Sequence, residues 1–400
     1  MPPPLLTIAQ ARELVMNAIE PLATEVLPVA DARDRVLAED LQAAGDVPPF
    51  PCSAMDGYAV LPGPAERRLR VVGESRAGTP ATDALREGEA IRISTGGAIP
   101  SGATAVIPQE NVEAGDGEIL TRAPVREGDN IRDAGEDMRA GDTILKRGCV
   151  LGAAELGAAV GAGAGRLTVA RRPRVQVLST GDELKAPGEP LGPGEIHNSN
   201  GPMLVALSEH QGATCPPADR LPDDRSATEA GLAGALETAD VVIVSGGVSV
   251  GPHDHVKPAL QTLGVEQMFW RVALQPGKPT WFGRRGNTLV FGLPGNPVSA
   301  VVTFALFVRP ALAALQGRAG ERLLESEAVL ATAIPRNHDR EQAVRVRLER
   351  RNGQLVATPN GAQGSHIVTS LLGADALALI GAGEGEVEAG ATVPLEPLPR

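Results

Sequence analysis

The sequence predicts a multidomain α/β protein in which a central parallel α/β sheet domain is joined by a mainly-β inserted domain, a mixed N-terminal domain and a C-terminal β-barrel. Three observations support this fold class. The chain has 400 residues, more than one hydrophobic core usually holds. Short apolar segments alternate with helical patterns in its second half, which is typical of a parallel sheet covered on both faces. Strand patterns separated by Gly and Pro turns lie on either side of that region. The expected domains are residues 1–45 with 138–172 (mixed), 46–137 (mainly β), 173–317 (α/β) and 318–400 (barrel).

The first half of the chain combines two helices with a run of short strands. Thr7 and Gln10 form a capping-box pattern that predicts a helix over Ile8–Glu20, and an Ala-rich segment predicts another over Ala153–Val160. Between them lie alternating segments bounded by turn residues, which predict the mainly-β domain: Leu69–Val72, Ala90–Ser94, Ala103–Ile107 and Glu118–Arg122.

The second half changes from the α/β rhythm to pure β alternation. The strands expected in the α/β domain are Val175–Leu178, Val241–Val244, Gln267–Ala273 and Thr288–Phe291, and its helices are Pro202–His210, Ser226–Thr238, Val256–Leu263 and Val298–Leu315. Beyond residue 317, the segment Val344–Leu348 alternates, and Asn352-Gly353 predicts a tight hairpin. A small barrel should therefore close the chain.

Composition excludes several classes of partner. Lys and Arg number 37 against 49 Asp and Glu, and the net charge of −12 gives no electrostatic footprint for nucleic acid or an anionic membrane. Six Phe, two Trp and one Tyr are too few for a base-stacking platform. The three cysteines lack C-x-x-C spacing, and the N-terminus lacks a signal-peptide pattern. We expect a cytoplasmic protein with no membrane span and no thiolate zinc site.

Two loops directly follow apolar strands, where open α/β sheets bind ligands. The first is Ser179-Thr180-Gly181-Asp182-Glu183 and the second is Ser245-Gly246-Gly247-Val248-Ser249-Val250-Gly251. Glycines allow backbone N–H groups to approach a phosphate, although the Gly-Lys-Ser/Thr ending of a Walker loop is missing. The alternative for the first loop is that its two acids begin a helix.

Five further patterns carry charge or turn residues. Gly292-Leu293-Pro294-Gly295-Asn296-Pro297 precedes a helix and suits an anion, or is only a Pro-rich helix start. Lys278 adds a cation that could equally be a surface charge. Asp254, between His253 and His255, could ligate a metal or lie in a solvated loop. Asp56 lies among the turn formers of Ser53–Ala59 and could instead cap a helix; Thr95 begins a similar Gly turn.

In order and spacing, these motifs resemble the MoeA family of molybdopterin molybdenumtransferases, which includes the E domain of gephyrin. The resemblance implies insertion of molybdate into adenylylated molybdopterin with Mg²⁺-dependent release of AMP. It also implies a homodimer whose cleft lies between the α/β domain of one subunit and the β domain of the other. The chain differs from the usual family pattern at Gln275, where a lysine is common, and at His197-Asn198, where Tyr-Asp is common.

The resemblance assigns roles to particular residues. Catalytic roles fall on Asp56, Thr95, Asp137, Glu183, Asp223, Asp254, Pro294 and Pro297, and Mg²⁺ would be held among Glu183, Asp223 and Asp254. Substrate binding falls on Ser179, Thr180, Gly181, Ser245, Gly246, Gly247, Ser249, Gly251, Gly295 and Asn296. Molybdate binding falls on Lys278, Ser299, Arg340, Arg345 and Ser370.

Two other functions compete with the insertase. A molybdopterin adenylyltransferase would need only the α/β domain, and the upstream acids and extra domains do not fit it. A gephyrin-like scaffold that binds a receptor peptide would not need the carboxylates. Beyond the homodimer, a molybdopterin adenylyltransferase and molybdoenzymes or their chaperones are the partners to expect.

Overall fold

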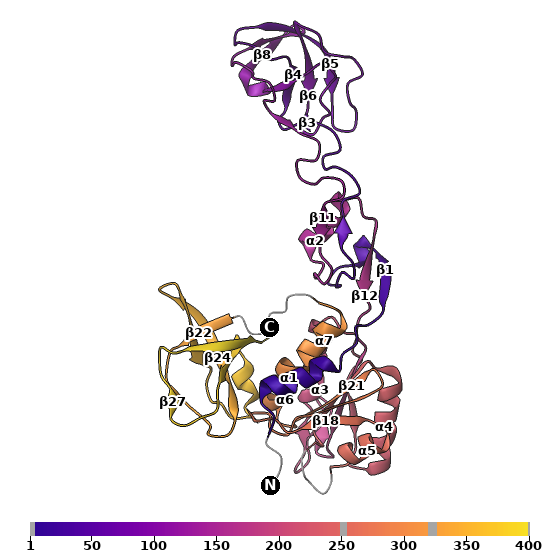
Figure 1. Cartoon of the computed structure of the whole chain (residues 1–400), viewed down its shortest axis with the longest axis vertical. Helices are drawn as coiled ribbons and strands as arrows, with labels where there is room; N and C mark the ends of the chain where they lie inside the picture. The colour runs from indigo at the N-terminus through magenta and orange to yellow at the C-terminus, as the bar shows by residue number, and fades with distance from the viewer. Residues whose placement is uncertain (1–4, 249–253, 319–325, 399–400) are drawn as a thin grey trace.

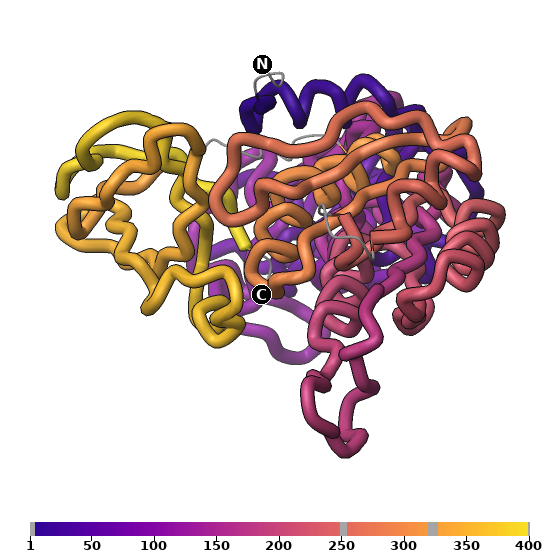
Figure 2. Tube along the Cα trace, turned by 90° about the horizontal axis from the view of Figure 1, so that it is seen from below, coloured from indigo at the N-terminus to yellow at the C-terminus, as the bar shows by residue number. Residues whose placement is uncertain are grey.

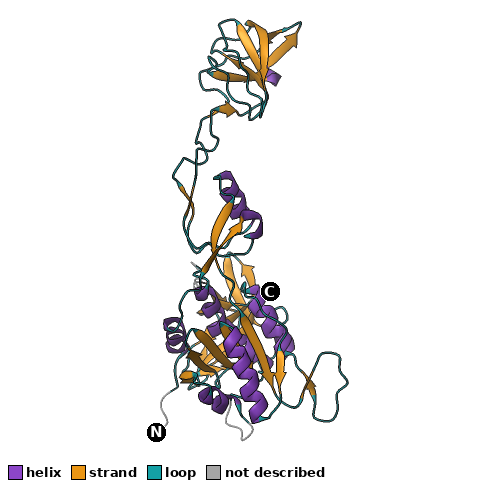
Figure 3. Ribbon diagram, turned by 90° about the vertical axis from the view of Figure 1, so that its right-hand side faces the viewer, coloured by secondary structure: helices purple, strands orange, loops and turns teal. Residues whose placement is uncertain are grey.

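The computed structural model describes residues 5–248, 254–318 and 326–398, and its four parts form an elongated protein (Figure 1). A β domain lies at one end. Two chain segments connect it to a small mixed domain, and the α/β domain and the barrel lie side by side at the other end (Figures 1 and 3). The predicted fold class is confirmed.

The mixed domain is built on two antiparallel strand pairs and one helix. β1 (Thr24–Pro28) pairs with β12 (Arg166–Ala170), and β2 (Leu41–Gln42) pairs with β11 (Thr143–Leu145). Helix α2 (Ala153–Gly161) and a short 3₁₀ turn, η1 (Val29–Asp31), pack between them. Their apolar side chains form a small separate core: Val29, Ala32, Leu37, Leu151, Ala159, Leu167 and Val169.

The N-terminal helix corrects the expected domain boundary. α1 (Ile8–Asn17) has the predicted capping box, in which the Thr7 hydroxyl accepts from the Gln10 N–H and the Gln10 side chain accepts from the Thr7 N–H. Its buried face, which includes Ile8, Ala11 and Val15, belongs to the core of the α/β domain. Residues 1–45 are therefore not one unit, because the apolar face of α1 is buried against a sheet that lies beyond residue 172.

The inserted domain is mainly β, as predicted. Its six-stranded sheet has the order β7 (Ala105–Pro108), β4 (Gly57–Val60), β6 (Glu89–Ile93), β5 (Arg68–Ser75), β9 (Glu118–Thr121) and β8 (Val112–Gly115). A second pair joins β3 (Cys52–Ser53) to β10 (Ile131–Arg132), and a short turn, η2 (Gln109–Asn111), follows β7. Apolar side chains form two buried clusters in this domain, so successive side chains such as those of Ala59 and Val60 are both buried.

The central sheet has six strands, of which four are parallel. The order is β16 (Asp219–Leu221), β13 (Val175–Thr180), β17 (Val241–Ser245), β21 (Thr288–Leu293), β20 (Trp281–Arg285) and β18 (Glu266–Trp270), and the last two run antiparallel to their neighbours. The sheet is thus mixed and not fully parallel. The sequence analysis missed β20, although Gly286-Asn287 between β20 and β21 is a two-residue hairpin signal and Gly286 has a φ of 57°.

Helices cover both faces of this sheet. α1, α3 (Asn200–His210) and the long helix α6–η3–α7 bury one face, and α4 (Arg225–Thr238) with α5 (Val256–Thr262) buries the other. The long helix comprises α6 (Pro297–Thr303), a π turn η3 (Phe304–Val308) and α7 (Arg309–Leu315). It is apolar and long enough to cross a membrane, but 94% of its most apolar window is buried inside the protein. It is therefore a core helix of this domain.

The C-terminal domain is a closed five-stranded barrel. β24 (Glu341–Arg351), β25 (Gln354–Pro359), β22 (Ser326–Leu330), β28 (Thr392–Pro397) and β26 (Ala376–Ile380) pair in turn, and β26 returns to β24. Asn352 and Gly353, with φ of 50° and 82°, form the predicted hairpin turn. Two further strands, β23 (Ile334–Pro335) and β27 (Glu386–Val387), pair at one side, and η4 (Val368–Leu371) precedes β26.

The barrel is attached to the α/β domain by polar and strand contacts. Glu396, which is fully buried, bridges Arg12 of α1 and Arg309 of α7. β19 (Leu274–Gln275), from the α/β half of the chain, pairs in parallel with β24, and Glu341 accepts from the N–H of Ile8 at 2.8 Å. Figure 2 shows the two domains side by side. The barrel therefore has a fixed position beside the sheet.

Candidate active site

A cavity of about 530 Å³ lies at the carboxyl ends of β13, β17 and β21. Its lining combines the three loops that the sequence singled out with the segment before α3. The lining residues are Ser179, Thr180, Gly181, Glu183, Leu184, Ile196, His197, Asn198, Ser199, Asn200, Asp223, Ser245, Gly246, Gly247, Asp254, Gly295, Asn296, Pro297 and His366. A cavity thus lies where the sequence predicts a ligand site.

Glycine allows the loops after β13 and β17 to touch. Gly246 and Gly247 have φ of 90° and 64°, and a Cβ on either would lie within 3 Å of the Thr180 hydroxyl oxygen. Gly181 has a φ of 139°, and a Cβ there would lie 2.3 Å from a carboxylate oxygen of Glu183. A larger residue at these positions would separate the loops or displace the carboxylate.

A buried asparagine joins the second and third loops. Asn200, at the start of α3, donates from Nδ2 to the Ser245 hydroxyl and to the Gly295 carbonyl, both at 2.8 Å. Among the residues that the structure describes, the Ser179 hydroxyl and the Asn200 Oδ1 are buried without a hydrogen-bond partner. Since buried polar atoms are usually satisfied, these two fit a polar ligand in the cavity.

Three of the predicted acids line this cavity. Glu183 follows β13, Asp223 follows β16, and Asp254 precedes α5. Asp223 is tied to Asp182 by reciprocal bonds, in which the N–H of each donates to the other's carboxylate at 3.1 and 3.4 Å. Residues 181–183 form a turn, so the alternative of a helix start is wrong.

The acids do not form a complete metal site by themselves. Within residues 5–248, 254–318 and 326–398, no three His, Cys, Asp or Glu side chains lie close enough to hold a metal ion. A Mg²⁺ ion usually takes one or two carboxylates and completes its octahedron with water and substrate phosphates. The cavity therefore suits Mg²⁺ that arrives with a phosphate ligand better than an ion bound by the protein alone.

The third loop is covered at the helix N-terminus. Pro297 has no N–H, and the Val298 N–H donates to the Ser365 carbonyl of the barrel at 3.1 Å. Asn296 donates from Nδ2 to the Ser365 hydroxyl, also at 3.1 Å. Gly295, Asn296 and Pro297 line the cavity, whereas Pro294 is buried behind it. Because a barrel carbonyl takes the first available donor, the predicted anion site at this terminus is partly covered.

The residues predicted to bind molybdate lie outside this cavity. Arg345 and Ser370 are together in the barrel, where Arg345 Nε donates to the Ser370 hydroxyl at 3.2 Å and the arginine is 1% exposed. Burial lowers the pKa of Arg345 to about 10. Lys278 is exposed, Arg340 is half-buried and Ser299 is buried within α6. Their shared role in molybdate binding stays a prediction.

The remaining predicted catalytic residues lie in the β domain or where the chain returns from it. Asp56, just before β4, accepts from both the N–H and the hydroxyl of Thr95, and these bonds lower the pKa of its carboxyl. Asp137 is exposed where the chain returns from the β domain, and its N–H donates to the Val47 carbonyl at 2.9 Å. Figure 1 shows the β domain remote from the central sheet, so one chain does not bring these residues to its own cavity.

Two of the predicted substrate residues, Ser249 and Gly251, lie outside the described residues, as does His253. His197 and Asn198 line the cavity at the base of a projecting loop, residues 186–195, visible in Figure 2. The ring of His197 contacts the Glu189 carbonyl at 2.9 Å, and Asn198 Oδ1 accepts from the Gly201 N–H at 3.0 Å. The residues that replace the usual Tyr-Asp thus hold this loop and the start of α3.

The sequence analysis missed His366. It reaches the cavity from the barrel, more than 60 positions after the third loop, and no local motif connects the two. The only sequence signal is Gly364-Ser365-His366, a glycine turn in a chain segment otherwise patterned as strands.

The fold and this cavity define a class: a multidomain α/β protein with a cavity of glycine-rich loops and carboxylates at the end of its sheet. Comparison with known proteins gives the family. Three family models match in order: the MoeA N-terminal region (domain I and II) over residues 6–163, a probable molybdopterin binding domain over 176–314, and the MoeA C-terminal region (domain IV) over 327–398. The chain belongs to the MoeA family.

Relatives and solved structures agree with that membership. The chain is 37% identical to the molybdopterin molybdenumtransferase of Haemophilus influenzae, with 98% of each sequence covered. It is 34% identical to the protein of the same name from Bacillus subtilis, over 92% of this chain and 89% of that one. The crystal structure of the molybdopterin biosynthesis MoeA protein from Pyrococcus horikoshii matches with a TM-score of 0.82 and 32% identity, covering 98% of this chain and 99% of that one.

Proposed function

We propose that this protein is a molybdopterin molybdenumtransferase that inserts molybdate into adenylylated molybdopterin and releases AMP. The observation that carries the proposal is the cavity, in which glycine-rich loops and the carboxylates of Glu183, Asp223 and Asp254 meet at three strand ends. Relatives that align over nearly the full length carry this enzyme name. The proposal places the protein in molybdenum cofactor biosynthesis, in the cytoplasm.

The chemistry of the lining suits a substrate with a pyrophosphate. The buried hydroxyl of Ser179 and the backbone N–H of Gly247 can donate to phosphate oxygens, whereas the Gly246 N–H already donates to the Leu293 carbonyl at 3.0 Å. Three carboxylates beside those oxygens would repel them, and Mg²⁺ held by these acids would neutralise charge on the leaving phosphate. The carboxylates would supply one or two of the ligands of such an ion, while the Asn200 amide keeps the second and third loops together.

We propose a homodimer for the same reaction. The pair Asp56 and Thr95, in the β domain, and Asp137, where the chain returns from that domain, match functional positions of the family, yet none of them lines the cavity. A second subunit that presents its β domain to the cavity would bring both groups of residues into one cleft. Molybdopterin adenylyltransferase, as the source of the substrate, and molybdoenzymes or their chaperones, as acceptors, remain the partners to test.

The decisive experiment is incubation of the purified protein with adenylylated molybdopterin, Mg²⁺ and molybdate, followed by measurement of AMP. The insertase predicts AMP release that depends on molybdate. An adenylyltransferase would instead consume ATP and molybdopterin and form the adenylylated compound. A scaffold would do neither, so the three functions give three separate results.

A further inference from the structure

The C-terminal barrel contributes one side chain to the cavity. All other lining residues belong to the range 179–297, whereas His366 comes from the barrel loop between β25 and η4. The three acids of the cavity, Glu183, Asp223 and Asp254, come from the α/β domain. His366 is thus the point at which the barrel takes part in the site.

The loop that carries His366 is attached to the α/β domain at the preceding residue. The Ser365 carbonyl accepts from the Val298 N–H, and the Ser365 hydroxyl accepts from Asn296 Nδ2, both at 3.1 Å. Asn296 itself lines the cavity. Two bonds at Ser365 therefore set where the next side chain lies.

The same loop is braced from inside the barrel by Arg345. Its Nη2 donates to the carbonyls of Ala362 and Gly364 at 3.2 and 3.4 Å. The Gln363 side chain accepts from the Arg345 N–H at 3.0 Å and donates to the Arg345 carbonyl at 3.2 Å. The buried guanidinium of Arg345 thus donates to carbonyls of the loop, which makes Arg345 a positioning residue for the loop.

The imidazole of His366 packs against the backbone of Gly364. A Cβ on Gly364 would lie 3.1 Å from His366 Cε1 and 3.0 Å from Ile367 Cδ1. The ring therefore lies against the bare backbone of Gly364. A side chain at that position would have to push the ring or the isoleucine away.

The ionisable groups that line the cavity indicate a role for the His366 ring. No Lys or Arg is among the described residues that line it, and its ionisable groups are the three acids and two histidines, His197 and His366. The Nε2 of His197 already contacts the Glu189 carbonyl. The ring of His366 has no hydrogen-bond partner among the described residues, so it can donate an N–H to a ligand in the cavity.

We propose that His366 is a further substrate-binding residue, whose ring N–H donates a hydrogen bond to a phosphate oxygen of the adenylylated substrate. Ser365, Gly364 and Arg345 position it. The inference rests on the proposed function, since it needs a phosphate in this cavity. It assigns the barrel a direct part in holding the substrate.

The test uses the full-length protein and AMP release as a function of the concentration of adenylylated molybdopterin. His366→Ala should raise KM at least tenfold, and His366→Gln, which keeps an N–H donor near the position of Nε2, should stay within about threefold of wild type. Imidazole added to His366→Ala should restore part of the rate. Gly364→Ala should raise KM by several-fold because it moves the ring. His210→Ala, a change at an exposed histidine outside the cavity, is the matched control.

Wild-type activity separates the two proposals. No molybdate-dependent AMP from the wild-type protein would contradict the proposed function. An active wild type with an unchanged KM in His366→Ala would overturn the inference about His366 alone. If the alanine variant melts early, His366→Gln and His366→Phe decide: the proposal expects a donor-dependent difference in KM between them, and equal values would refute it.

Discussion

The carboxylate of Asp56 accepts two hydrogen bonds from Thr95, one from the backbone N–H at 2.7 Å and one from the hydroxyl at 3.1 Å. Both residues are exposed in the β domain, where a plain structural role would not require a fixed carboxylate. The bonds lower the pKa of Asp56, so the group is held in its charged form. This arrangement fits a residue that contributes to the active site of a second subunit.

Subunit mixing tests whether Asp56 contributes to the active site of a second subunit. Asp56→Ala and Asp254→Ala should each be inactive alone, and a mixture that exchanges subunits should recover part of the AMP release, because one cleft of the mixed dimer contains both intact residues. Asp56→Ala carrying a second affinity tag, mixed with untagged Asp56→Ala, is the control for exchange. Proven exchange without recovery would place the two residues in separate sites.

Glu183→Gln should lower molybdate-dependent AMP release at least tenfold with little change in melting temperature. The carboxylate lies in the cavity and not in a core, so its loss affects the reaction more than the fold. Gly181→Ala should act in the same direction, since its Cβ would collide with that carboxylate. Glu229→Gln, on the outer side of α4, serves as the control. A large drop in melting temperature with normal turnover would contradict this prediction.

Gln275→Lys should lower the molybdate concentration needed for half-maximal AMP release. The neighbouring cations are already engaged: Arg271 lies over the Trp270 ring, Arg284 is 3.9 Å from Glu266, and Arg285 is 2.6 Å from Glu237. A second ammonium would attract a dianion, and a net gain of about 1.4 kcal/mol corresponds to tenfold in affinity.

The size of that gain depends on a contact that the lysine would remove. Gln275 Oε1 accepts from Asn337 Nδ2 at 2.6 Å, so the substitution breaks a bond between β19 and the barrel. Molybdate titrations of wild type, Gln275→Lys and Lys278→Ala decide the matter. Unchanged half-saturation in the first variant would show that the missing cation is irrelevant, and unchanged half-saturation in Lys278→Ala would remove this loop from molybdate binding.

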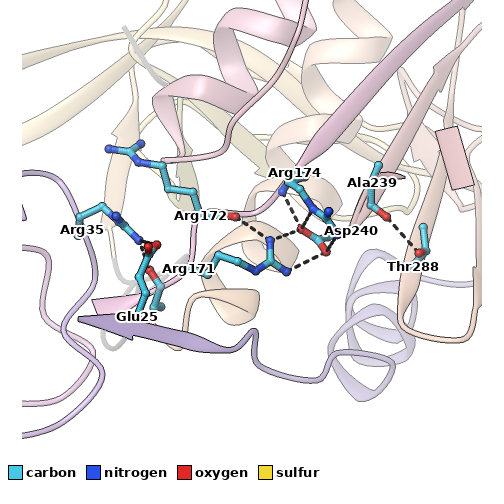
Figure 4. Close-up of polar contacts among 9 residues, drawn as sticks. Glu25, Arg35, Arg171, Arg172, Arg174, Ala239, Asp240 and Thr288 are labelled. Atoms are coloured by element: carbon cyan, nitrogen blue, oxygen red, sulfur yellow. Dashed lines mark hydrogen bonds and ion pairs between the residues drawn. The ribbon is translucent and has the colours of Figure 1, made fainter. Parts of the chain in front are cut away.

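Asp240 should make stability depend on pH at the junction of the mixed and α/β domains (Figure 4). Burial alone would raise the pKa of Asp240, but hydrogen bonds from Arg171 and Arg174 outweigh that effect and lower it to about 2. The contribution is therefore complete above the unfolded-state pKa of about 4 and is lost as the pH falls from about 4 to 2.

Asp240→Asn should destabilise the protein by about 1 to 2 kcal/mol at pH 7, since screening reduces the full effect. The difference in unfolding free energy between variant and wild type should shrink below pH 4. Denaturant melts at several pH values measure it. Glu25→Gln, which alters the nearby ion pair with Arg35, is the comparison. A difference that stays constant down to pH 2.5 would show that the carboxylate charge is not responsible.

Local patterns predicted most of the elements but not their assembly. The capping box at Thr7 located α1, yet nothing near it indicated that Ile8 and Val15 pack on a sheet formed after residue 172. Strand ends predicted the cavity because parallel strands share an edge. His366 could not be predicted in this way, since its place depends on barrel docking through Glu396 and Ser365.

The two chain segments that lead to the β domain run together as they leave the mixed domain. β2 and β11 pair, and Val47 and Met138 form a further antiparallel bridge. The inserted β domain thus begins and ends at neighbouring points in space, and the bridge between Val47 and Met138 joins its two connecting segments. Replacement of residues 48–137 by a short turn should leave the remaining chain able to fold and to bind adenylylated molybdopterin. The excised β domain should fold as a separate protein. Exchange of the β domain between relatives at this joint would then show whether the β domain or the rest of the protein determines the preference for molybdate.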